Sequence, residues 1–279
     1  MGEPFIGSEA VRAGRLTPYA LRSRYRAVLP GIYLPPGAEI TAITRAKAVW
    51  LWTGRAGVVA GQSAAALHGA KWVDARRPAE ILWSNRHAPR GIVVWSDSVA
   101  DDELDVVRGV RVTTPERTAL DIACRYPLDR AVAALDALAR ATKLKIADVE
   151  LLAERHKGRR GIRQAREALD LVDAGAESPQ ETRVRLLLIR AGFPRPETQI
   201  PVYDDCGGLI GELDMGWRDK MIAVDYEGDH HRRTPWEFNK GIRRHDAVTD
   251  RGWDDIRVTS ADTDGGIVAR VWTAWHRRV

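Results

Sequence analysis

The sequence has few of the features that mark extracellular or membrane proteins. Its 279 residues include two cysteines, Cys124 and Cys206, too few and too far apart for a disulfide framework or a cysteine-rich zinc site. The longest apolar stretches, such as 46–52, are far shorter than the roughly 20 residues of a membrane-spanning helix. Glu3 and Glu9 stand where a signal peptide would need an apolar segment. These absences predict a cytoplasmic protein without a membrane segment.

The composition is that of a globular protein with several folded units. Hydrophobic residues make up 44% of the chain and charged residues 29%, which excludes a disordered or fibrous protein. The length exceeds that of most single domains, so two or three units are expected. The net charge of +5 at pH 7 and the isoelectric point near 9.4 are compatible with a polyanionic partner.

Residues 1–38 carry the pattern of a winged helix-turn-helix. A short helix is expected from Ser8, and Thr17 is placed to cap a second helix that begins with Pro18. Apolar residues on both sides of a Pro-Gly turn at 30–31 then predict a small hairpin. Two short helices followed by a hairpin is the order of a winged helix, which binds DNA.

The same segment is basic, because no Asp or Glu occurs between Ala10 and Ala38. Its arginines are Arg12, Arg15, Arg22, Arg24 and Arg26. Such a run can neutralise phosphates, and we expect Arg22 and Arg24 to contact DNA. The alternative is a solvated basic face on a small helical cap, and the residues alone leave both interpretations open.

An α+β region without a catalytic constellation is predicted over 39–157. Its expected helices cover 41–53, 63–68, a segment from 114, 128–142 and 146–156, and its expected strands cover 81–83, 92–95 and 110–113. A glycine-rich basic break follows at 157–161. One amphipathic helix within 158–175 is expected to link this region to the last domain, 176–279.

The last domain has the predicted element order α-β-β-β-α-β-α. Its helices are expected from Ser178 to about 191, over 234–249 and over 266–276, and its strands over 198–202, 209–217, 221–227 and 256–260.

Two of these strands, 209–217 and 221–227, are expected to pair around a turn at 219–220. With a two-residue loop, the apolar side chains of both strands share one face, as register selection requires. The expected pairs on that face are Trp217 with Ile222, Met215 with Val224, and Leu213 with Tyr226.

The opposite face of these strands gathers carboxylates. Asp214 then faces Asp225, and Glu212 faces Glu227, with no lysine or arginine between them. Opposed side chains lie about 5 Å apart, so like charges there are destabilising. Mg²⁺ or Mn²⁺ bound by Asp214, Asp225 and Glu227 would offset the repulsion, because both ions prefer oxygen ligands. A proton shared between carboxylates or a solvated sheet edge are the alternatives.

The residues after the acidic strand suit phosphodiester chemistry. They include His230, His231, Arg232 and Arg233. A metal lowers the pKa of bound water, arginines bind neighbouring phosphates, and a histidine serves as general acid or base. The alternative is that the two histidines cap the following helix.

At these positions the sequence resembles a known family. Glu181, Gln199, the segment Glu-Leu-Asp-Met-Gly-Trp at 212–217 and the segment at 224–232 resemble the endonuclease-like domains related to very-short-patch-repair (Vsr) enzymes. Those domains belong to the PD-(D/E)XK nuclease superfamily, and the resemblance covers 176–279. It implies a restriction-endonuclease-like αβββαβ fold and a metal-dependent phosphodiesterase site.

The resemblance assigns roles to individual residues. It implies Asp214 as principal metal ligand, Asp225 and Glu227 as the second acidic pair, Glu181 as a further ligand, Gln199 in positioning water, and the family's histidine at His230 or His231. The chain departs from the family at 225–227, which read Asp-Tyr-Glu where Glu-x-Asp is usual. It also lacks the signature lysine of the superfamily.

The earlier part of the chain resembles the AbiEi-like antitoxin modules of type IV toxin–antitoxin systems. The motifs are Gly-Ile-Tyr at 31–33, Ser-Ala-Ala-Ala-Leu-His-Gly at 63–69 and Val-Thr-Thr-Pro-Glu-Arg at 112–117, within a resemblance that covers about 5–140. It implies DNA binding, autoregulation and a partner toxin, and it carries no catalytic residue.

Two hypotheses follow for this α/β protein. The first is a DNA-binding endonuclease that hydrolyses phosphodiester bonds with Mg²⁺ or Mn²⁺. The alternative is an antitoxin-type transcriptional regulator whose nuclease fold is inactive. Retention of Asp214, Asp225 and Glu227 favours the enzyme. Phosphate chemistry does not distinguish DNA from RNA, so RNA stays open as a substrate, and the sequence leaves the oligomeric state open.

Overall fold

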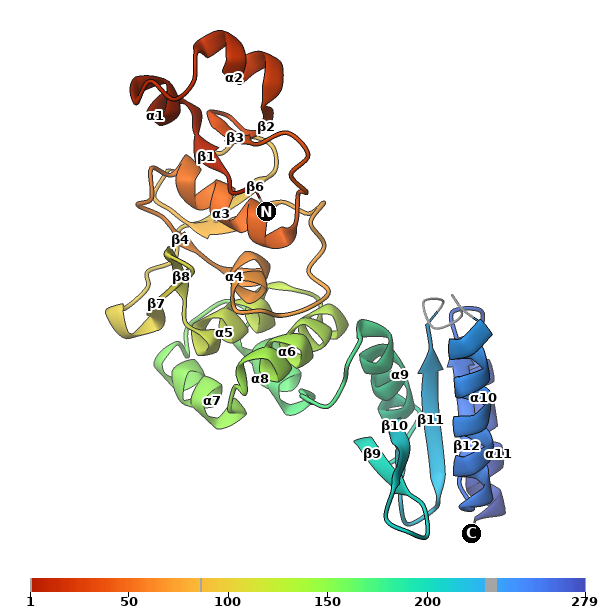
Figure 1. Ribbon diagram of the computed structural model, residues 1–279. Helices are drawn as coiled ribbons and strands as arrows, with labels where there is room; N and C mark the ends of the chain where they lie inside the picture. The colour runs from red at the N-terminus through yellow and green to blue at the C-terminus, as the bar shows by residue number, and fades with distance from the viewer. Residues whose placement is uncertain (1, 86, 229–234, 279) are drawn as a thin grey trace. The chain divides into compact units, whose positions relative to one another are not determined.

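The computed structural model describes residues 2–85, 87–228 and 235–278 (Figure 1). The chain divides into two units, Met1–Val172 and Asp173–Val279. Each unit combines helices with strands, so the predicted α/β class is confirmed. None of the described helices is long and apolar enough to cross a membrane.

The chain begins with two short helices and a hairpin, in the expected order. The elements are β1 (Phe5–Ile6), α1 (Gly7–Arg12), α2 (Pro18–Arg24), β2 (Arg26–Leu29) and β3 (Ile32–Leu34). Thr17 caps α2 because its Oγ1 accepts a hydrogen bond from the N–H of Ala20 at 3.1 Å. The hairpin turns at Gly31, whose φ of +76° favours glycine. β1 pairs with β3, so the sheet has the antiparallel order β1-β3-β2.

A second sheet, of five strands, lies in the same unit. Its strands are β4 (Val58–Val59), β5 (Ala79–Leu82), β6 (Ile92–Trp95), β7 (Leu104–Val107) and β8 (Val110–Thr113), in the order β6-β5-β4-β8-β7. The pairs β5–β6 and β4–β8 are parallel, and the other two pairs are antiparallel. The helices α3 (Ala42–Trp52) and α4 (Gly61–Leu67) pack against β5.

Four further helices complete the N-terminal unit. After the short 3-10 helix η1 (Asp101–Glu103), they are α5 (Pro115–Arg125), α6 (Leu128–Thr142), α7 (Ile146–Arg155) and α8 (Ile162–Asp170). The helix expected within 158–175 is α8. It buries Ala165, Ala168 and Leu169 and packs against α5, α6 and α7, so it lies inside the N-terminal unit.

The C-terminal unit follows the expected order α-β-β-β-α-β-α. Its elements are α9 (Pro179–Arg190), β9 (Glu197–Tyr203), β10 (Leu209–Trp217), β11 (Ile222–Glu227), α10 (Pro235–Asp250), β12 (Asp254–Thr259) and α11 (Asp264–Arg277). The sheet order is β12-β11-β10-β9, with β9, β10 and β11 antiparallel and β12 parallel to β11.

Both faces of this sheet are covered. Met215, Trp217 and Val224 pack with residues of α9 and α11 in one cluster. Ala223 packs in another cluster with Val248 of α10. The sheet is therefore the middle of three layers, with α9 and α11 on one face and α10 on the other. The acidic residues of β10 and β11 lie within this closely packed frame.

Candidate functional site

The register of β10 and β11 is the expected one where the two strands leave their turn. The observed pairs are Trp217 with Ile222, Gly216 with Ala223, and Met215 with Val224. The four apolar residues of these pairs were expected to share one face, and all four pack in the cluster under α9 and α11: Met215, Trp217, Ile222 and Val224. The hydrophobic pattern therefore set this register.

Beyond Met215 the two carboxylates replace the regular ladder. The N–H of Asp214 donates to Oδ1 of Asp225 at 2.8 Å. The N–H of Tyr226 donates to Oδ2 of Asp214 at 2.7 Å. Each carboxylate therefore accepts a backbone hydrogen bond from the opposite strand, and Asp225 is only 4% exposed. The predicted meeting of Asp214 and Asp225 is present in the structure.

The strands are irregular on the other side of Asp214 as well. In the pairing of β9 with β10, Thr198 pairs with Met215 and Ile200 with Leu213, which places Gln199 opposite Asp214. Gln199 has a φ of +51°, in the left-handed region that is costly for a residue with a side chain. Its predicted role in positioning water stays a prediction.

The expected pairing of Leu213 with Tyr226 is wrong. Leu213 packs with Ile200 and Val248, whereas Tyr226 packs against the cluster on the other face. The alternation of side chains therefore breaks between Leu213 and Met215, at Asp214. A period-2 pattern cannot anticipate such a break.

Arg244 of α10 is the cation closest to the acidic pair among the described contacts. Its Nη2 donates to Oδ2 of Asp225 at 2.8 Å and to the backbone carbonyl of Glu212. A side chain at Gly211 would collide with Arg244, so glycine at that position leaves room for the guanidinium. Arg244 lies four residues before the buried Val248, so the two residues share one face of α10. This spacing is the sequence signal that could have predicted that Arg244 faces the sheet.

Glu181, predicted as a possible metal ligand, completes a capping arrangement at the start of α9. The N–H of Glu181 donates to Oγ of Ser178 at 3.2 Å, and Oε2 of Glu181 accepts from the N–H of Glu177 at 2.7 Å. The buried side chain nevertheless lies near enough to Asp214 to act on its charge.

The acidic pair favours a bound proton. Burial, followed by the charges of Asp225 and Glu181, raises the pKa of Asp214 to about 8. The pKa of Asp255, on β12, is also raised, first by burial and then by the charge of Asp225. The Oδ2 of Asp255 lies 2.7 Å from Nδ1 of His245. Asp214 therefore keeps a proton at neutral pH.

The three predicted metal ligands do not converge in this arrangement. Glu227 forms an ion pair with Arg257, and Asp225 is bound by Arg244. Within the described ranges, no group of three or more His, Cys, Asp or Glu side chains lies close enough to hold a metal ion. Glu212 is exposed. The described donor set does not fit Mg²⁺ or Mn²⁺, which need several oxygen ligands around one point.

The predicted catalytic and phosphate-binding residues His230, His231, Arg232 and Arg233 lie outside the described residues.

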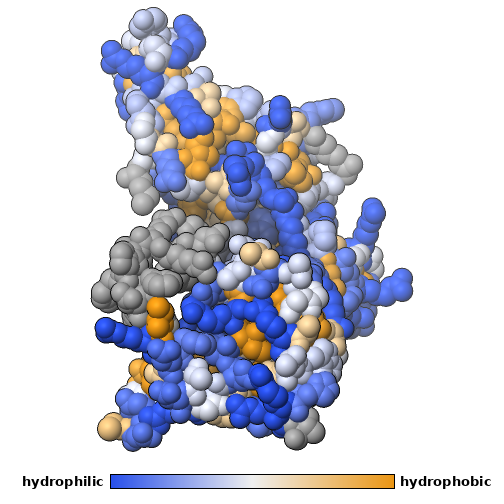
Figure 2. Space-filling view, turned by 90° about the vertical axis from the view of Figure 1, so that its right-hand side faces the viewer, coloured by the Kyte–Doolittle hydropathy of each residue, from blue (hydrophilic) through white to orange (hydrophobic). Residues whose placement is uncertain are grey.

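The predicted DNA-binding arginines are on the surface of the first unit. Arg22 and Arg24 are exposed near the end of α2, as are the other arginines of this segment: Arg12, Arg15 and Arg26. The tip of the first unit, at the top of Figure 2, is mostly hydrophilic, and a hydrophobic area lies directly below it. A hollow of about 350 Å³ between α1, α2 and Tyr33 is lined by Arg12 and Arg22. The segment therefore presents several cations and no carboxylate between residues 10 and 38.

Part of the first unit is similar to a known protein family. Residues 55–171 match the AbiEi antitoxin C-terminal domain family. This match confirms the AbiEi-like part of the prediction. The predicted resemblance covered about 5–140, whereas the match covers 55–171 and includes α7 and α8. No solved structure matches the chain.

Two relatives are known from Mycobacterium tuberculosis, one in strain CDC 1551 / Oshkosh and one in strain ATCC 25618 / H37Rv, and both carry the name uncharacterized protein. Each is 33% identical to this chain over 171 residues, which is 60% of this chain and 63% of the relative. The match thus spans somewhat less than two thirds of the relatives' own length.

Proposed function

We propose that the chain is a DNA-binding transcriptional regulator of the antitoxin type. The observation that carries the proposal is the match of residues 55–171 to the AbiEi antitoxin C-terminal domain family. Earlier in the chain, α1, α2 and the β2–β3 hairpin present exposed arginines. In the proposal, residues 1–38 are a winged helix that binds duplex DNA.

Arg22 and Arg24 carry the phosphate contacts in this proposal. Thr17 and Pro18 fix the start of α2, so the exposed arginines at its other end are presented by a defined helix rather than a loose loop. Each neutralised phosphate contributes about 0.9 to the slope of log affinity against log salt concentration. Losing both contacts should therefore lower the slope by about 2.

The test is binding of the full chain to two fluorescent duplexes of equal length, one taken from upstream of its own reading frame and one of random sequence. Affinity is measured at several salt concentrations for the parent and for the Arg22→Ala, Arg24→Ala double variant. The matched control changes two exposed arginines of the five-stranded sheet region, Arg90 and Arg111, to alanine.

The proposal expects weaker binding and a slope lower by about 2 for the double variant, and parental values for the control. Preference of the parent for the upstream duplex would establish regulation of its own gene. An unchanged slope in the Arg22 and Arg24 variant would show that α2 does not contact phosphates.

A toxin is the partner that an antitoxin requires. Expression of the reading frame beside that of this chain should slow bacterial growth, and coexpression of the chain should restore it. A neighbouring product without effect on growth would contradict the antitoxin part of the proposal and leave DNA binding untouched.

The C-terminal unit supports a second candidate function, a metal-dependent nuclease. In this candidate the unit has a restriction-endonuclease-like fold, which its α-β-β-β-α-β order and its mixed sheet support. The specific observation in favour is that Asp214 and Asp225 meet where the regular ladder of β10 and β11 ends. The ion pairs of Asp225 with Arg244 and of Glu227 with Arg257 count against it.

Cleavage assays separate the two candidates. Supercoiled plasmid and labelled DNA and RNA strands are incubated with EDTA, Mg²⁺ or Mn²⁺ and with the parent or the Asp214→Ala chain. Metal-dependent cleavage by the parent alone would establish the nuclease, and the RNA arm would identify its substrate. Intact substrates with every metal, together with salt-dependent DNA binding, are the result that the regulator predicts.

A further inference from the structure

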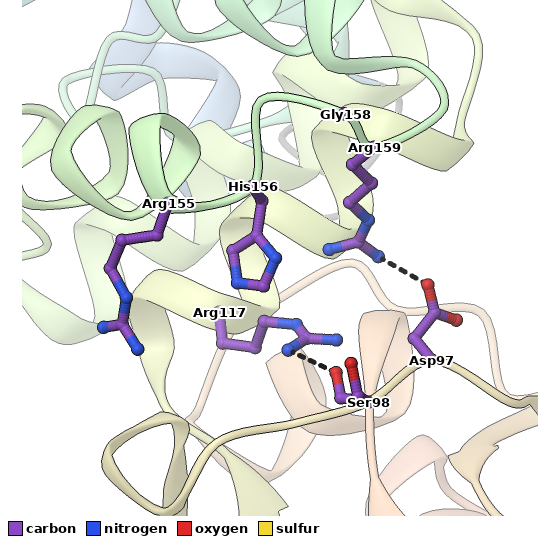
Figure 3. Close-up of a pocket in the computed structure, with 7 residues that line it drawn as sticks. All are labelled: Asp97, Ser98, Arg117, Arg155, His156, Gly158 and Arg159. Atoms are coloured by element: carbon purple, nitrogen blue, oxygen red, sulfur yellow. Dashed lines mark hydrogen bonds and ion pairs between the residues drawn. The ribbon is translucent and has the colours of Figure 1, made fainter.

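A polar pocket in the N-terminal unit uses none of the residues of the two sites described above. A hollow of about 330 Å³ is lined by Arg117 of α5, Arg155 of α7, and His156 and Arg159 of the loop that follows α7. Figure 3 shows the guanidinium groups of Arg117 and Arg159 and the imidazole of His156 pointing toward one another. A second hollow, of about 730 Å³, shares Arg159 with the first and adds further arginines. We call the two hollows together the arginine pocket.

The loop at 157–161 is held rigidly at the end of α5. Gly161 has a φ of +88°, and any side chain there would collide with the backbone carbonyl of Cys124. Nε2 of Gln164 donates to the carbonyls of Ala123 at 3.0 Å and Tyr126 at 2.6 Å. These contacts anchor the backbone at the end of the basic Gly-Arg-Arg-Gly sequence beside the pocket.

Carboxylates bind guanidinium groups at both the rim and the floor of the pocket. At the rim, Asp102 accepts hydrogen bonds from Nη1 and Nη2 of Arg155 at 2.7 and 3.0 Å. Arg117, which is 1% exposed, binds Glu103 and donates through Nε to Oδ1 of Asp121 at 3.1 Å. Nη2 of Arg159 also binds Asp121, and Arg159 forms an ion pair with Asp97 at 3.6 Å. These pairs hold the guanidinium groups of Arg117 and Arg159 in place.

One buried nitrogen in the pocket lacks an acceptor. The side chain of Arg159 is 9% exposed, and its Nη1 has no hydrogen-bond partner among the residues that the structure describes. Leaving a charged donor buried and unpaired costs free energy, about 1–3 kcal/mol or more. An acceptor oxygen of a bound ligand would satisfy it.

The lining selects an anion with several oxygens. The two hollows are lined by five arginines and two carboxylates: Arg117, Arg125, Arg155, Arg159 and Arg160, with Glu80 and Asp97. Arg155 and Arg160 are exposed at the rim. The planar guanidinium group matches the paired oxygens of a phosphate, and one such oxygen would fill the open position at Nη1 of Arg159.

We propose that the arginine pocket is a phosphate-binding site, in which Arg159 is the buried anchor and Arg155 and Arg160 line the rim. The phosphate belongs to a free nucleotide or to the 5′ end of a nucleic acid strand. The site uses none of the residues assigned to DNA contact in α2, so the two proposals can fail separately.

The test is isothermal titration calorimetry of the full chain with inorganic phosphate, adenosine 5′-monophosphate, and a short single-stranded oligonucleotide carrying a 5′-phosphate or a 5′-hydroxyl. The main variant is the Arg155→Ala, Arg160→Ala double change. The matched control is Arg163→Ala, which removes an exposed arginine of α8 outside the lining. Arg159→Lys keeps the charge at the anchor but removes the fork of donors.

We expect the double variant to bind the phosphate probes at least about tenfold more weakly, which corresponds to about 1.4 kcal/mol, and Arg163→Ala to bind them like the parent. Arg159→Lys should bind more weakly as well. If Arg159→Lys fails to fold, as judged by circular dichroism, the rim variant still decides. Tighter binding of the mononucleotide than of the oligonucleotide assigns the free nucleotide, and the reverse with a requirement for the 5′-phosphate assigns the strand end.

Three results would overturn the proposal. One is absence of binding by every probe at millimolar concentration. Another is equal affinity of the parent and the rim variant. The third is an equal loss in the rim variant and in Arg163→Ala, since that would indicate diffuse attraction by surface charge. Duplex binding through α2, measured in parallel on the rim variant, should keep its parental salt slope.

Discussion

Replacing Asp214 by asparagine should remove a pH dependence from the stability of the C-terminal sheet. Asparagine keeps an oxygen that accepts the N–H of Tyr226, and the backbone N–H of residue 214 still donates to Asp225. The variant therefore preserves the hydrogen bonds across β10 and β11 and removes only the ionisable group.

The magnitude follows from the raised pKa of Asp214, about 8 in the folded chain, against about 3.9 in an unfolded one. Between these values the folded chain keeps a proton at Asp214 that the unfolded chain has lost. The stabilisation from this proton is complete below about pH 4 and is lost as the pH rises to about 8. The loss is about 1.4 kcal/mol per pH unit, or about 3 kcal/mol from pH 5 to pH 7.

Native-state hydrogen exchange measures this effect in the right place, because the protected amides of β10 and β11 report the free energy of opening their own sheet. The opening free energy of Asp214→Asn minus that of the parent should rise by about 3 kcal/mol from pH 5 to pH 7. Asp219→Asn, at an exposed carboxylate in the turn between the same strands, is the control. Parallel curves for the parent and Asp214→Asn would refute the reasoning.

Three further substitutions test the packing. Gly161→Ala should lower the free energy of unfolding of the N-terminal unit by about 1–3 kcal/mol, measured by urea denaturation, because its φ is +88° and its Cβ meets backbone. Arg117→Met removes the buried cation that Glu103 and Asp121 share and should cost about 3–5 kcal/mol in the same assay, and a cost below 1 kcal/mol would contradict the role of this ion pair. Met215→Ala should lower the stability of the C-terminal sheet by about 2–5 kcal/mol, seen as faster amide exchange, because the side chain is fully buried.

The short-range signals of the sequence located most elements. Thr114 followed by Pro115 marked the start of α5, and Ser178 followed by Pro179 marked the start of α9. Cap and first-turn chemistry act within three residues, so they are legible without a fold. The strands β1 and β4 were missed, because two residues carry no measurable alternation and are strands only through their partners.

The sequence by itself determined that Asp214 meets Asp225, since apolar alternation in two neighbouring strands allows one register. It did not determine which cations neutralise them. Arg244 of α10 reaches Asp225 across 19 positions of the chain, and Arg159 reaches Asp121 across 38 positions. Such pairs depend on how helices pack over long separations, and local periodicity carries no information about that. The tertiary structure alone therefore decided that the carboxylate pair is bound by an arginine and that a second cluster of arginines surrounds a pocket.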